Sequence, residues 1–505
     1  MDRRSFLKAV GLGWASLAAP RWARAAAPKR GDGRPNIVVI LCDDLGYSDL
    51  GCYGGEIATP HLDRLAAEGL RFTRFYNCAK CAPTRATLLT GTYYQRSRTM
   101  KRPNTVTIAE VLRAAGYTTL MAGKWHLPRT PIQRGFERFF GFLGGATNYF
   151  KGDGSFRLDE QRFDVPAKGF YCTDAFTDHA VRLVEQAAAK DKPFFLYLAY
   201  NAPHYPLQAW PADIDRYRGK FRKGWDRLRD ERYRRMLRMK LIRPQWALTK
   251  RDERVPAWEE LDEKRRADED LLMAVYAAMV ECMDRNIGRL LEKLKRLGVE
   301  DNTLVLFLSD NGGCPYRNER KPDSVPGGPE SHRTYNTPWA NVSNTPFRLY
   351  KRYSHEGGTA TPLIARWPKV IRNGGALSDQ VGHIIDIMPT CAELAGAKHP
   401  KAFGGSDILP VDGKSLVPIL HGRRREPHEH LFWEYARHRA VRKGDWKLVA
   451  ERGKAWELYD MSADRCETRD LSAKHPDLVA ELRRAYNAWA KDAGAAPGDA
   501  TAPDD

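Results

Sequence analysis

The segment that begins at Cys81 could supply a nucleophile. Cys81 is followed by Ala82, Pro83, Thr84 and Arg85. Pro83 is favoured at the start of a helix, so we expect Cys81 near a helix N-terminus, where free N–H groups favour an anion. A thiolate there could act as a nucleophile. The alternative is a small, buried structural cysteine, which is the usual role of a free cysteine.

Four apolar runs end in polar residues that could form one site. The runs are residues 36–41, 117–122, 194–200 and 304–308, and the polar residues near their ends are Asp43, Asp44, Lys124, His126, Asn201, His204, Asp310 and Asn311. Continuous apolar strands that alternate with helices are typical of a parallel sheet covered on both faces. Ligand sites of such sheets lie at the carboxyl ends of the strands, so these side chains are expected to converge. Each pair alone could equally cap a helix or form a turn.

The order of the strands and helices that position these residues predicts an α/β fold. Helices are expected at residues 60–68, 107–115, 174–188 and 268–297, which alternate with the strands. After residue 397 the pattern changes to short antiparallel strands at 430–435, 439–442, 447–450 and 457–459, followed by an amphipathic helix at 476–491. We therefore predict a large, mixed, mostly parallel sheet sandwiched by helices over residues 34–397. A smaller α+β subdomain over 398–493 and a disordered tail over 494–505 follow it.

The motifs between these elements resemble those of the type I sulfatases of the alkaline phosphatase superfamily. Residues 81–91 match C-x-P-[ST]-R followed by L-L-T-G, with Thr84 where most members have Ser. Other motifs of the family stand in order at residues 43–47, 59–63, 123–126, 202–204, 309–312, 355–358, 458–460 and 467–468. The resemblance covers residues 36–489. It implies an alkaline phosphatase-like fold and hydrolysis of sulfate monoesters.

The resemblance also implies a modified residue and a metal ion. In this family a formylglycine-generating enzyme oxidises the cysteine at the position of Cys81 to formylglycine (3-oxoalanine), whose hydrate attacks sulfate esters. The matching metal ligands are Asp43, Asp44, Asp310 and Asn311, with the modified Cys81 beside the ion. Carboxylate and amide oxygens favour a hard cation, so calcium is expected, with magnesium second.

Cationic and imidazole side chains complete the site that the resemblance implies. Arg85, Lys124 and Lys351 match the positions that stabilise charge on the leaving oxygen during S–O cleavage. His204, together with Lys351, would donate a proton to the leaving alcohol. His126 would accept the proton from the remaining hydroxyl, which expels sulfate and restores the aldehyde.

The first 25 residues are typical of an export signal. Arg3 and Arg4 precede a short apolar stretch over residues 9–19, and residues 23–25 form an A-x-A cleavage site. We expect a twin-arginine signal peptide over residues 1–25, a contact with the twin-arginine translocase, and a periplasmic or secreted protein. The stretch is too short to span a membrane and no lipid-accepting cysteine follows it, so no stable membrane anchor is predicted. The nine scattered cysteines do not form a disulfide framework.

The positive charge of the chain suggests an anionic partner but does not identify its class. The formal net charge is +19, and residues 216–243 contain 13 Lys or Arg against 3 Asp or Glu. A nucleic-acid face is one interpretation of such a segment. Related arylsulfatases carry a similar segment at this place, so we interpret it as a family element, either a solvated helix face or an aid to an anionic substrate. No nucleic-acid partner is predicted.

Three functions remain open on these grounds. The leading hypothesis is an exported, calcium-dependent sulfatase that acts on an aryl sulfate or a sulfated saccharide. A phosphodiesterase or phosphonate monoester hydrolase of the same superfamily is the alternative enzyme, because sulfate and phosphate esters resemble each other. A catalytically silent protein that holds sulfated glycans is the alternative outside enzymes.

Overall fold

The computed structural model describes residues 33–190 and 192–498. The predicted signal peptide and residues 499–505 of the predicted tail lie outside these ranges. Residues 494–498 of that tail lie against the last helix, α13 (Pro476–Ala493), where the hydroxyl of Tyr486 donates to the carbonyl of Ala496 at 3.0 Å. In the described part of the chain, no helix is both long enough and apolar enough to cross a membrane.

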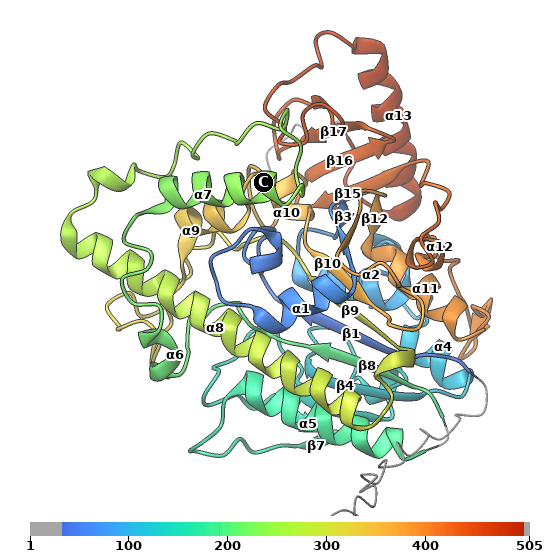
Figure 1. Ribbon diagram of the computed structural model, residues 1–505. Helices are drawn as coiled ribbons and strands as arrows, with labels where there is room; N and C mark the ends of the chain where they lie inside the picture. Colours follow the sequence, from blue (N-terminus) through green and yellow to red (C-terminus); the bar gives the residue numbers. More distant parts are fainter. Residues whose placement is uncertain (1–32, 191, 499–505) are drawn as a thin grey trace, which may run out of the picture. The chain divides into compact units, whose positions relative to one another are not determined.

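A ten-stranded mixed sheet forms the centre of the fold (Figure 1). Its five central strands run parallel in the order β9 (Thr303–Ser309), β1 (Asn36–Cys42), β8 (Phe194–Ala199), β4 (Thr118–Lys124) and β5 (Arg138–Phe142). Beyond β9 lie β10 (Leu363–Arg366), β2 (Leu70–Phe72) and β11 (Ala376–Ser378), and beyond β5 lie β6 (Phe156–Leu158) and β7 (Gln161–Arg162). The predicted fold class is confirmed.

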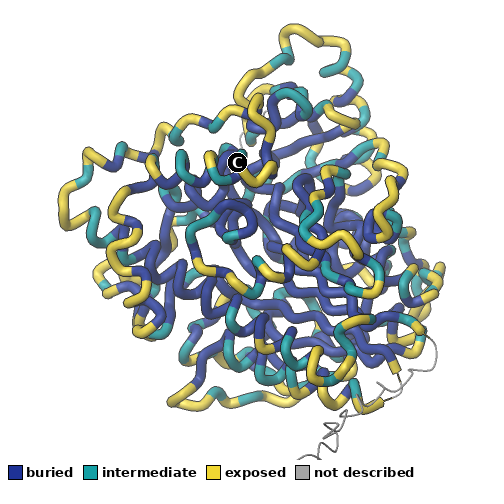
Figure 2. The backbone as a smooth tube through the Cα atoms, in the orientation of Figure 1, coloured by how far each residue is buried: buried dark blue, intermediate teal, exposed yellow. Residues whose placement is uncertain are grey.

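Helices cover both faces of this sheet. Along β1, Val38 and Ile40 belong to one hydrophobic core and Val39 and Leu41 to the other, because successive side chains of a strand point to opposite faces. The first core includes residues of α1 (Pro60–Glu68), α5 (Cys172–Ala188) and α8 (Glu263–Arg296), and the second includes residues of α2 (Cys81–Thr90), α4 (Ile108–Ala114) and α11 (Ile387–Leu394). Every residue of β9, β1, β8 and β4 is buried, and in β5 only Arg138 is partly exposed (Figure 2).

The long helix α8 begins earlier than its apolar pattern predicts. It starts at Glu263 because Asp262 caps it, accepting a hydrogen bond from the backbone N–H of Arg265 at 2.7 Å. The first turn is polar, so the apolar periodicity that marks a helix in sequence begins only at residue 268.

The C-terminal part forms a separate four-stranded antiparallel sheet. Its strands are β15 (Leu431–Tyr435), β16 (His438–Lys443), β17 (Trp446–Ala450) and β18 (Glu457–Asp460). Val441, Leu448 and Leu458 pack against Leu482 and Tyr486 of α13. The predicted antiparallel sheet and closing helix are therefore both present.

Candidate active site

The carboxyl ends of neighbouring strands bring four predicted metal ligands together. Asp43 and Asp44 follow β1, and Asp310 and Asn311 follow the adjacent strand β9. The backbone N–H of Asp44 donates to Asp310 Oδ1 at 3.2 Å, and Asn311 Nδ2 donates to Asp44 Oδ1 at 2.7 Å. Asp44 has a φ of +69°, an uncommon backbone conformation for a residue with a side chain. All four side chains are buried.

Cys81 is the first residue of α2, as predicted, and lies beside this cluster. It is 3% exposed and interacts electrostatically with Arg85, Asp310 and Lys351. Thr84 fixes the helix to the sheet, since its hydroxyl donates to the carbonyl of Asp310 at 2.7 Å and accepts from the N–H of Cys78 at 3.1 Å. All nine cysteines, Cys78 included, are buried free thiols.

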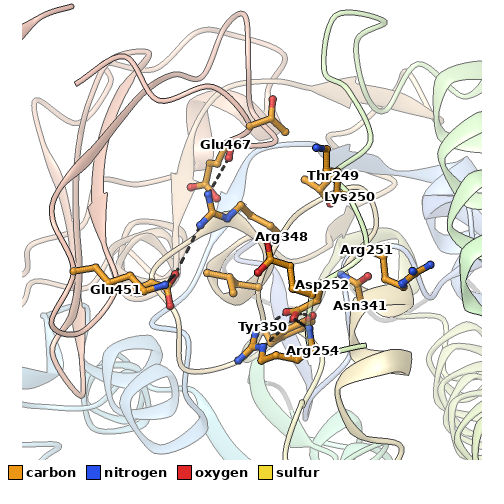
Figure 3. Close-up of a pocket in the computed structure, with 14 residues that line it drawn as sticks. Thr249, Lys250, Arg251, Asp252, Arg254, Asn341, Arg348, Tyr350, Glu451 and Glu467 are labelled. Carbon is orange, nitrogen blue, oxygen red and sulfur yellow. Dashed lines mark hydrogen bonds and ion pairs between the residues drawn. The ribbon is translucent and has the colours of Figure 1, made fainter. Parts of the chain in front are cut away.

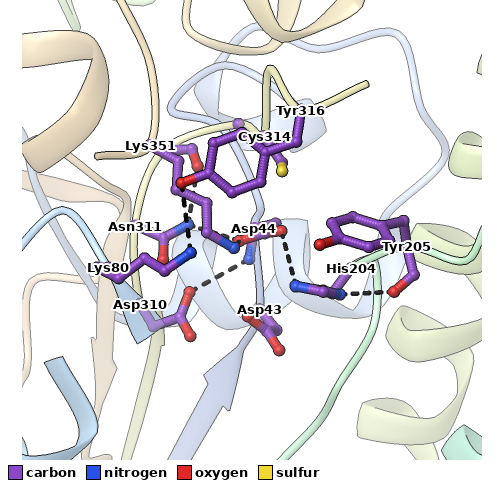
Figure 4. Close-up of polar contacts among 12 residues, drawn as sticks. Asp43, Asp44, Lys80, His204, Tyr205, Asp310, Asn311, Cys314, Tyr316 and Lys351 are labelled. Carbon is purple, nitrogen blue, oxygen red and sulfur yellow. Dashed lines mark hydrogen bonds and ion pairs between the residues drawn. The ribbon is translucent and has the colours of Figure 1, made fainter. Parts of the chain in front are cut away.

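Three buried cations pair with three buried carboxylates. Arg85 Nη2 lies 3.1 Å from Asp310 Oδ2, Lys124 Nζ contacts Asp43 Oδ2, and Lys351 Nζ lies 2.5 Å from Asp44 Oδ1. Figure 4 shows Lys351, Asp44, Asp310 and Asn311 at this junction of the strand ends. Removal of one member of a pair would leave its partner as an uncompensated buried charge, which is costly.

The charges act differently on the three carboxyl groups. Burial would raise the pKa of Asp43, but Lys124, His204 and Arg85 outweigh it and lower that pKa well below its ordinary value. Burial and the neighbouring charge of Asp43 raise the pKa of Asp310 well above its ordinary value. Burial would also raise the pKa of Asp44, but Lys351 and His204 outweigh it and lower that pKa. Of the three carboxyl groups, only Asp310 is therefore crowded beyond what the neighbouring cations compensate.

Three oxygens of the cluster are suited to hold a cation. In the described part of the chain, Asp43 Oδ1, Asp44 Oδ2 and Asn311 Oδ1 are buried and have no hydrogen-bond partner. Buried polar atoms are almost always paired, so three unsatisfied oxygens in one cluster need an explanation. A hard cation would satisfy them and relieve the crowding of Asp310. The residues present thus fit the predicted metal ion.

His204 lies next to these oxygens. Its Nε2 is 3.5 Å from Asp44 Oδ2, and ligand atoms of Asp43, Asp44 and His204 lie within 4.8 Å of one another. Its Nδ1 is 2.6 Å from the carbonyl of Tyr205, which fixes Nδ1 as the donor and directs Nε2 toward the carboxylates. His204 is therefore also placed as a possible metal ligand, a role that the sequence did not predict for it.

His126 follows β4 on the same edge of the sheet. Its Nδ1 is buried and has no hydrogen-bond partner among the described residues. Burial, reinforced by Lys124 and Arg85, lowers the pKa of His126 to about 2. The imidazole is therefore neutral at pH 7, and its role as a base stays a prediction.

Gly145 is required for the position of His126. A Cβ at Gly145 would lie 2.6 Å from His126 Nε2, whereas a Cβ at Gly144 would meet nothing closer than 3.7 Å. We expect Gly145→Ala to lower kcat by about 10- to 100-fold, because a displaced base loses its alignment. The matched control Gly144→Ala should keep kcat within about twofold. Equal kcat values for the two variants in steady-state assays would contradict this role of Gly145.

The basic segment over residues 216–243 is largely structural. Its helix α7 (Trp225–Arg238) carries the buried Arg232, which binds Asp49 at 2.7 Å and Glu56 at 2.7 Å. Asp49 in turn accepts from the N–H of Gly46 at 2.9 Å. Several exposed cations pair with acids, in Arg216–Glu281, Arg222–Glu263, Arg227–Glu231 and Arg234–Asp230. The segment therefore supports the loop that follows Asp43 and Asp44.

A cavity of about 610 Å³ lies beside the chain that leads to Lys351 (Figure 3). Its charged lining residues neutralise one another: Arg254 is 2.6 Å from Asp252, and Arg348 is 3.8 Å from Glu451. None of the predicted catalytic or metal-binding residues lines it. This cavity therefore does not include the cluster of predicted site residues.

The sequence did not reveal the residues that border the cluster. Lys80, Tyr205 and Tyr316 are partly exposed, whereas Asp44 and Lys351 are almost completely buried. The rings of His204 and Tyr205 stack at 4.3 Å, and Lys80 Nζ donates to the hydroxyl of Tyr316 at 3.3 Å. Only the positions of Tyr205 next to His204 and of Lys80 next to Cys81 gave a signal for their proximity.

Two family models match most of the described chain. The family model described as Sulfatase matches residues 35–397, and the model described as N-sulphoglucosamine sulphohydrolase, C-terminal, matches residues 347–491. An arylsulfatase of Klebsiella aerogenes is 34% identical over 443 residues, which cover 79% of this chain and 94% of that protein.

Solved structures give the same result. Ps i-CgsB in complex with k-i-k-neocarrahexaose aligns with a TM-score of 0.67 and 27% identity, covering 91% of this chain and 93% of that chain. A second structure, determined in complex with its substrate D-glucosamine-2-N,6-O-disulfate, aligns with a TM-score of 0.64 and 25% identity, covering 91% of this chain and 98% of that chain.

Proposed function

The chain belongs to the sulfatase family and is a sulfatase, and from this premise we propose that it hydrolyses sulfate monoesters with a formylglycine made from Cys81 and a calcium ion. The observation that carries the proposal is the set of three unsatisfied buried oxygens, on Asp43, Asp44 and Asn311, in the cluster that borders Cys81. Oxygen ligands favour calcium, and magnesium is the second choice.

The modified residue and the metal ion would share the chemistry with the side chains around them. A formylglycine hydrate at residue 81 would supply an oxygen nucleophile, and bound calcium would supply positive charge for the sulfate oxygens. Asp43, Asp44, Asp310 and Asn311 would hold the ion. Because these groups are buried, water is excluded and the electrostatic interactions are strong.

The cations would act on the substrate directly. Arg85 and Lys124 are fixed by carboxylates, so they are already oriented when the sulfate group arrives. Burial would lower the pKa of Lys351, but Asp44 outweighs it and raises that pKa well above its ordinary value. Lys351 therefore holds a proton at neutral pH for the leaving alcohol.

The two histidines would move protons on opposite sides of the reaction. Burial lowers the pKa of His204 to about 4, so its imidazole is neutral at pH 7. We therefore propose that His204 transfers a proton from Lys351 to the leaving alcohol. His126, neutral at pH 7, would accept the proton of the hydroxyl that remains after sulfur is transferred.

The substrate class and the compartment are part of the proposal. A sulfated saccharide is favoured because a structural relative is bound to D-glucosamine-2-N,6-O-disulfate as its substrate. An aryl sulfate would serve as a proxy substrate. We also propose export by the twin-arginine route to the periplasm or beyond, after the formylglycine-generating enzyme has acted, because Arg3 and Arg4 open a signal-like segment.

The function is tested by comparing two anions in one assay. Protein coexpressed with a formylglycine-generating enzyme and supplied with calcium should hydrolyse 4-nitrophenyl sulfate with a kcat/KM at least about 100-fold above that for bis(4-nitrophenyl) phosphate. The reverse preference would establish the phosphodiesterase alternative. Absence of turnover with both substrates and with a panel of sulfated saccharides would favour a silent glycan-binding protein.

Removal of the metal is expected to destabilise the protein as well as inactivate it. A ligand at 100 times its Kd stabilises the folded state by about 2.7 kcal/mol, so calcium should raise Tm after treatment with EDTA. Asp43→Asn should greatly reduce this shift, because it removes one negative charge from the ligands of the ion. The control Asp178→Asn, at an exposed ion pair with Arg289, should keep it. Equal Tm values with calcium and with EDTA, measured by calorimetry, would contradict the metal site.

A further inference from the structure

Lys80 is a cation that the proposed mechanism does not use. The ammonium groups of Lys124 and Lys351 pair with Asp43 and Asp44. Across residues 33–190 and 192–498, no carboxylate oxygen lies within 4.0 Å of Lys80 Nζ. Among the described residues, no ion pair therefore occupies the ammonium group of Lys80.

Lys80 is held at the border of the catalytic cluster. It is the N-cap residue of α2 and directly precedes Cys81. Its Nζ lies 4.7 Å from the ring centroid of Tyr316, and Lys351 Nζ lies 5.7 Å from the same centroid. Figure 4 shows Lys80 and Lys351 beside Tyr316. The ammonium groups of Lys80 and of Lys351, the proposed proton donor, therefore both lie next to the ring of Tyr316.

A second aromatic side chain borders the cluster. Tyr205 stacks on His204, and its hydroxyl accepts a hydrogen bond from Asn318 Nδ2 at 3.2 Å. Tyr316 and Asn318 belong to the same loop, so one loop positions both tyrosines. Aromatic faces pack well against rings, and pockets commonly combine such faces with a few oriented polar groups.

We propose that the leaving group of the substrate is a ring with a second anionic group, which Lys80 binds while Tyr205 and Tyr316 contact the ring. The proposal rests on the proposed sulfatase function and narrows its substrate to alcohols that already carry a sulfate or a carboxylate, as polysulfated or uronic-acid saccharides do. Charge-assisted hydrogen bonds to such a group are stronger than neutral ones and give specificity.

The test uses two aryl sulfates that differ in one charge, 4-nitrophenyl sulfate and 2-carboxy-4-nitrophenyl sulfate. Lys80→Met should lower kcat/KM for the carboxylated substrate by about 10- to 100-fold and for the other substrate by less than about threefold. Lys80→Arg should keep most of the preference. The ratio of the two kcat/KM values is independent of the fraction of enzyme that carries formylglycine.

A matched control and a binding measurement make the result decisive. Lys220 also lies over a tyrosine, 4.9 Å from the ring centroid of Tyr217, so Lys220→Met should leave the ratio unchanged. In the Cys81→Ala background, calorimetric titration should show that Lys80→Met weakens binding of the carboxylated substrate only. Equal effects on both substrates, or no preference in the parent, would overturn the proposal. Turnover of 4-nitrophenyl sulfate by the parent tests the sulfatase function separately.

Discussion

Cys81→Ala is expected to lower kcat/KM for 4-nitrophenyl sulfate by at least about 10⁴-fold, the largest effect on activity of any single substitution in this chain. The reason is that alanine can supply neither the nucleophile nor its oxidised precursor, while the buried cations and carboxylates remain in place. Steady-state kinetics measures the loss. Mass spectrometry of the peptide that contains Cys81 should show the parent residue with its sulfur and two hydrogens replaced by one oxygen.

The neighbouring cysteine provides the control for this substitution. Cys78 is also buried, and its thiol contacts the hydroxyl of Thr87 at 3.4 Å. Cys78→Ala should keep kcat/KM within about threefold, since Cys78 does not border the cations or the carboxylates. An intact thiol at Cys81 in fully active protein, or turnover retained in Cys81→Ala, would exclude the formylglycine mechanism.

The strand ends were predictable because their signal is local. The run before Asp43 and Asp44 and the run before Asp310 and Asn311 are continuously apolar, which is typical of strands buried on both faces. Adjacent parallel strands then place the residues that follow them at one edge. The helix start at Cys81 was predictable for a similar reason, because Pro83 marks the first turn.

The partners of the buried charges were not predictable, because they join residues that are distant in sequence. Lys351 pairs with Asp44, and Arg232 of α7 pairs with Asp49. No periodicity or propensity encodes such a pair. The sequence showed only a basic segment. Its support of the loop that follows Asp43 and Asp44 became visible when the tertiary structure supplied the carboxylates.

The partners of Glu356 were also not predictable from the sequence. The sequence identified residues 355–358 as a motif, but not its function. Glu356 Oε1 lies 2.9 Å from Lys447 Nζ of β17, and its Oε2 lies 2.8 Å from Arg465 Nε. Lys447 Nζ also lies 2.8 Å from Glu467 Oε1, and all of these side chains are completely buried. This network joins α10 (Glu356–Thr359), which follows Lys351, to the C-terminal sheet.

Lys447→Met is expected to lower the free energy of unfolding by about 3–5 kcal/mol, the largest effect on stability that we predict. Methionine fills much of the volume of lysine, but it leaves the carboxylates of Glu356 and Glu467 buried without the ammonium between them. Denaturant unfolding followed by circular dichroism measures the loss. The control Lys454→Met removes an exposed ion pair with Glu451 and should change stability by less than about 1 kcal/mol.

The pH dependence of stability should change in the same variant. Burial would raise the pKa of Glu356, but Lys447 and Arg465 outweigh it and lower that pKa to about 2. Glu356 therefore stabilises the fold above the ordinary pKa of 4.5, and this contribution is lost as the pH falls toward 2. In Lys447→Met, the loss of stability between neutral and acidic pH should be smaller, because Glu356 then binds a proton more readily in the folded state. Adding Glu467→Gln to Lys447→Met should restore part of the stability, because it removes one of the two buried charges. If the pH dependence does not change and the double variant is no more stable, Lys447 is not the group that stabilises the two carboxylates.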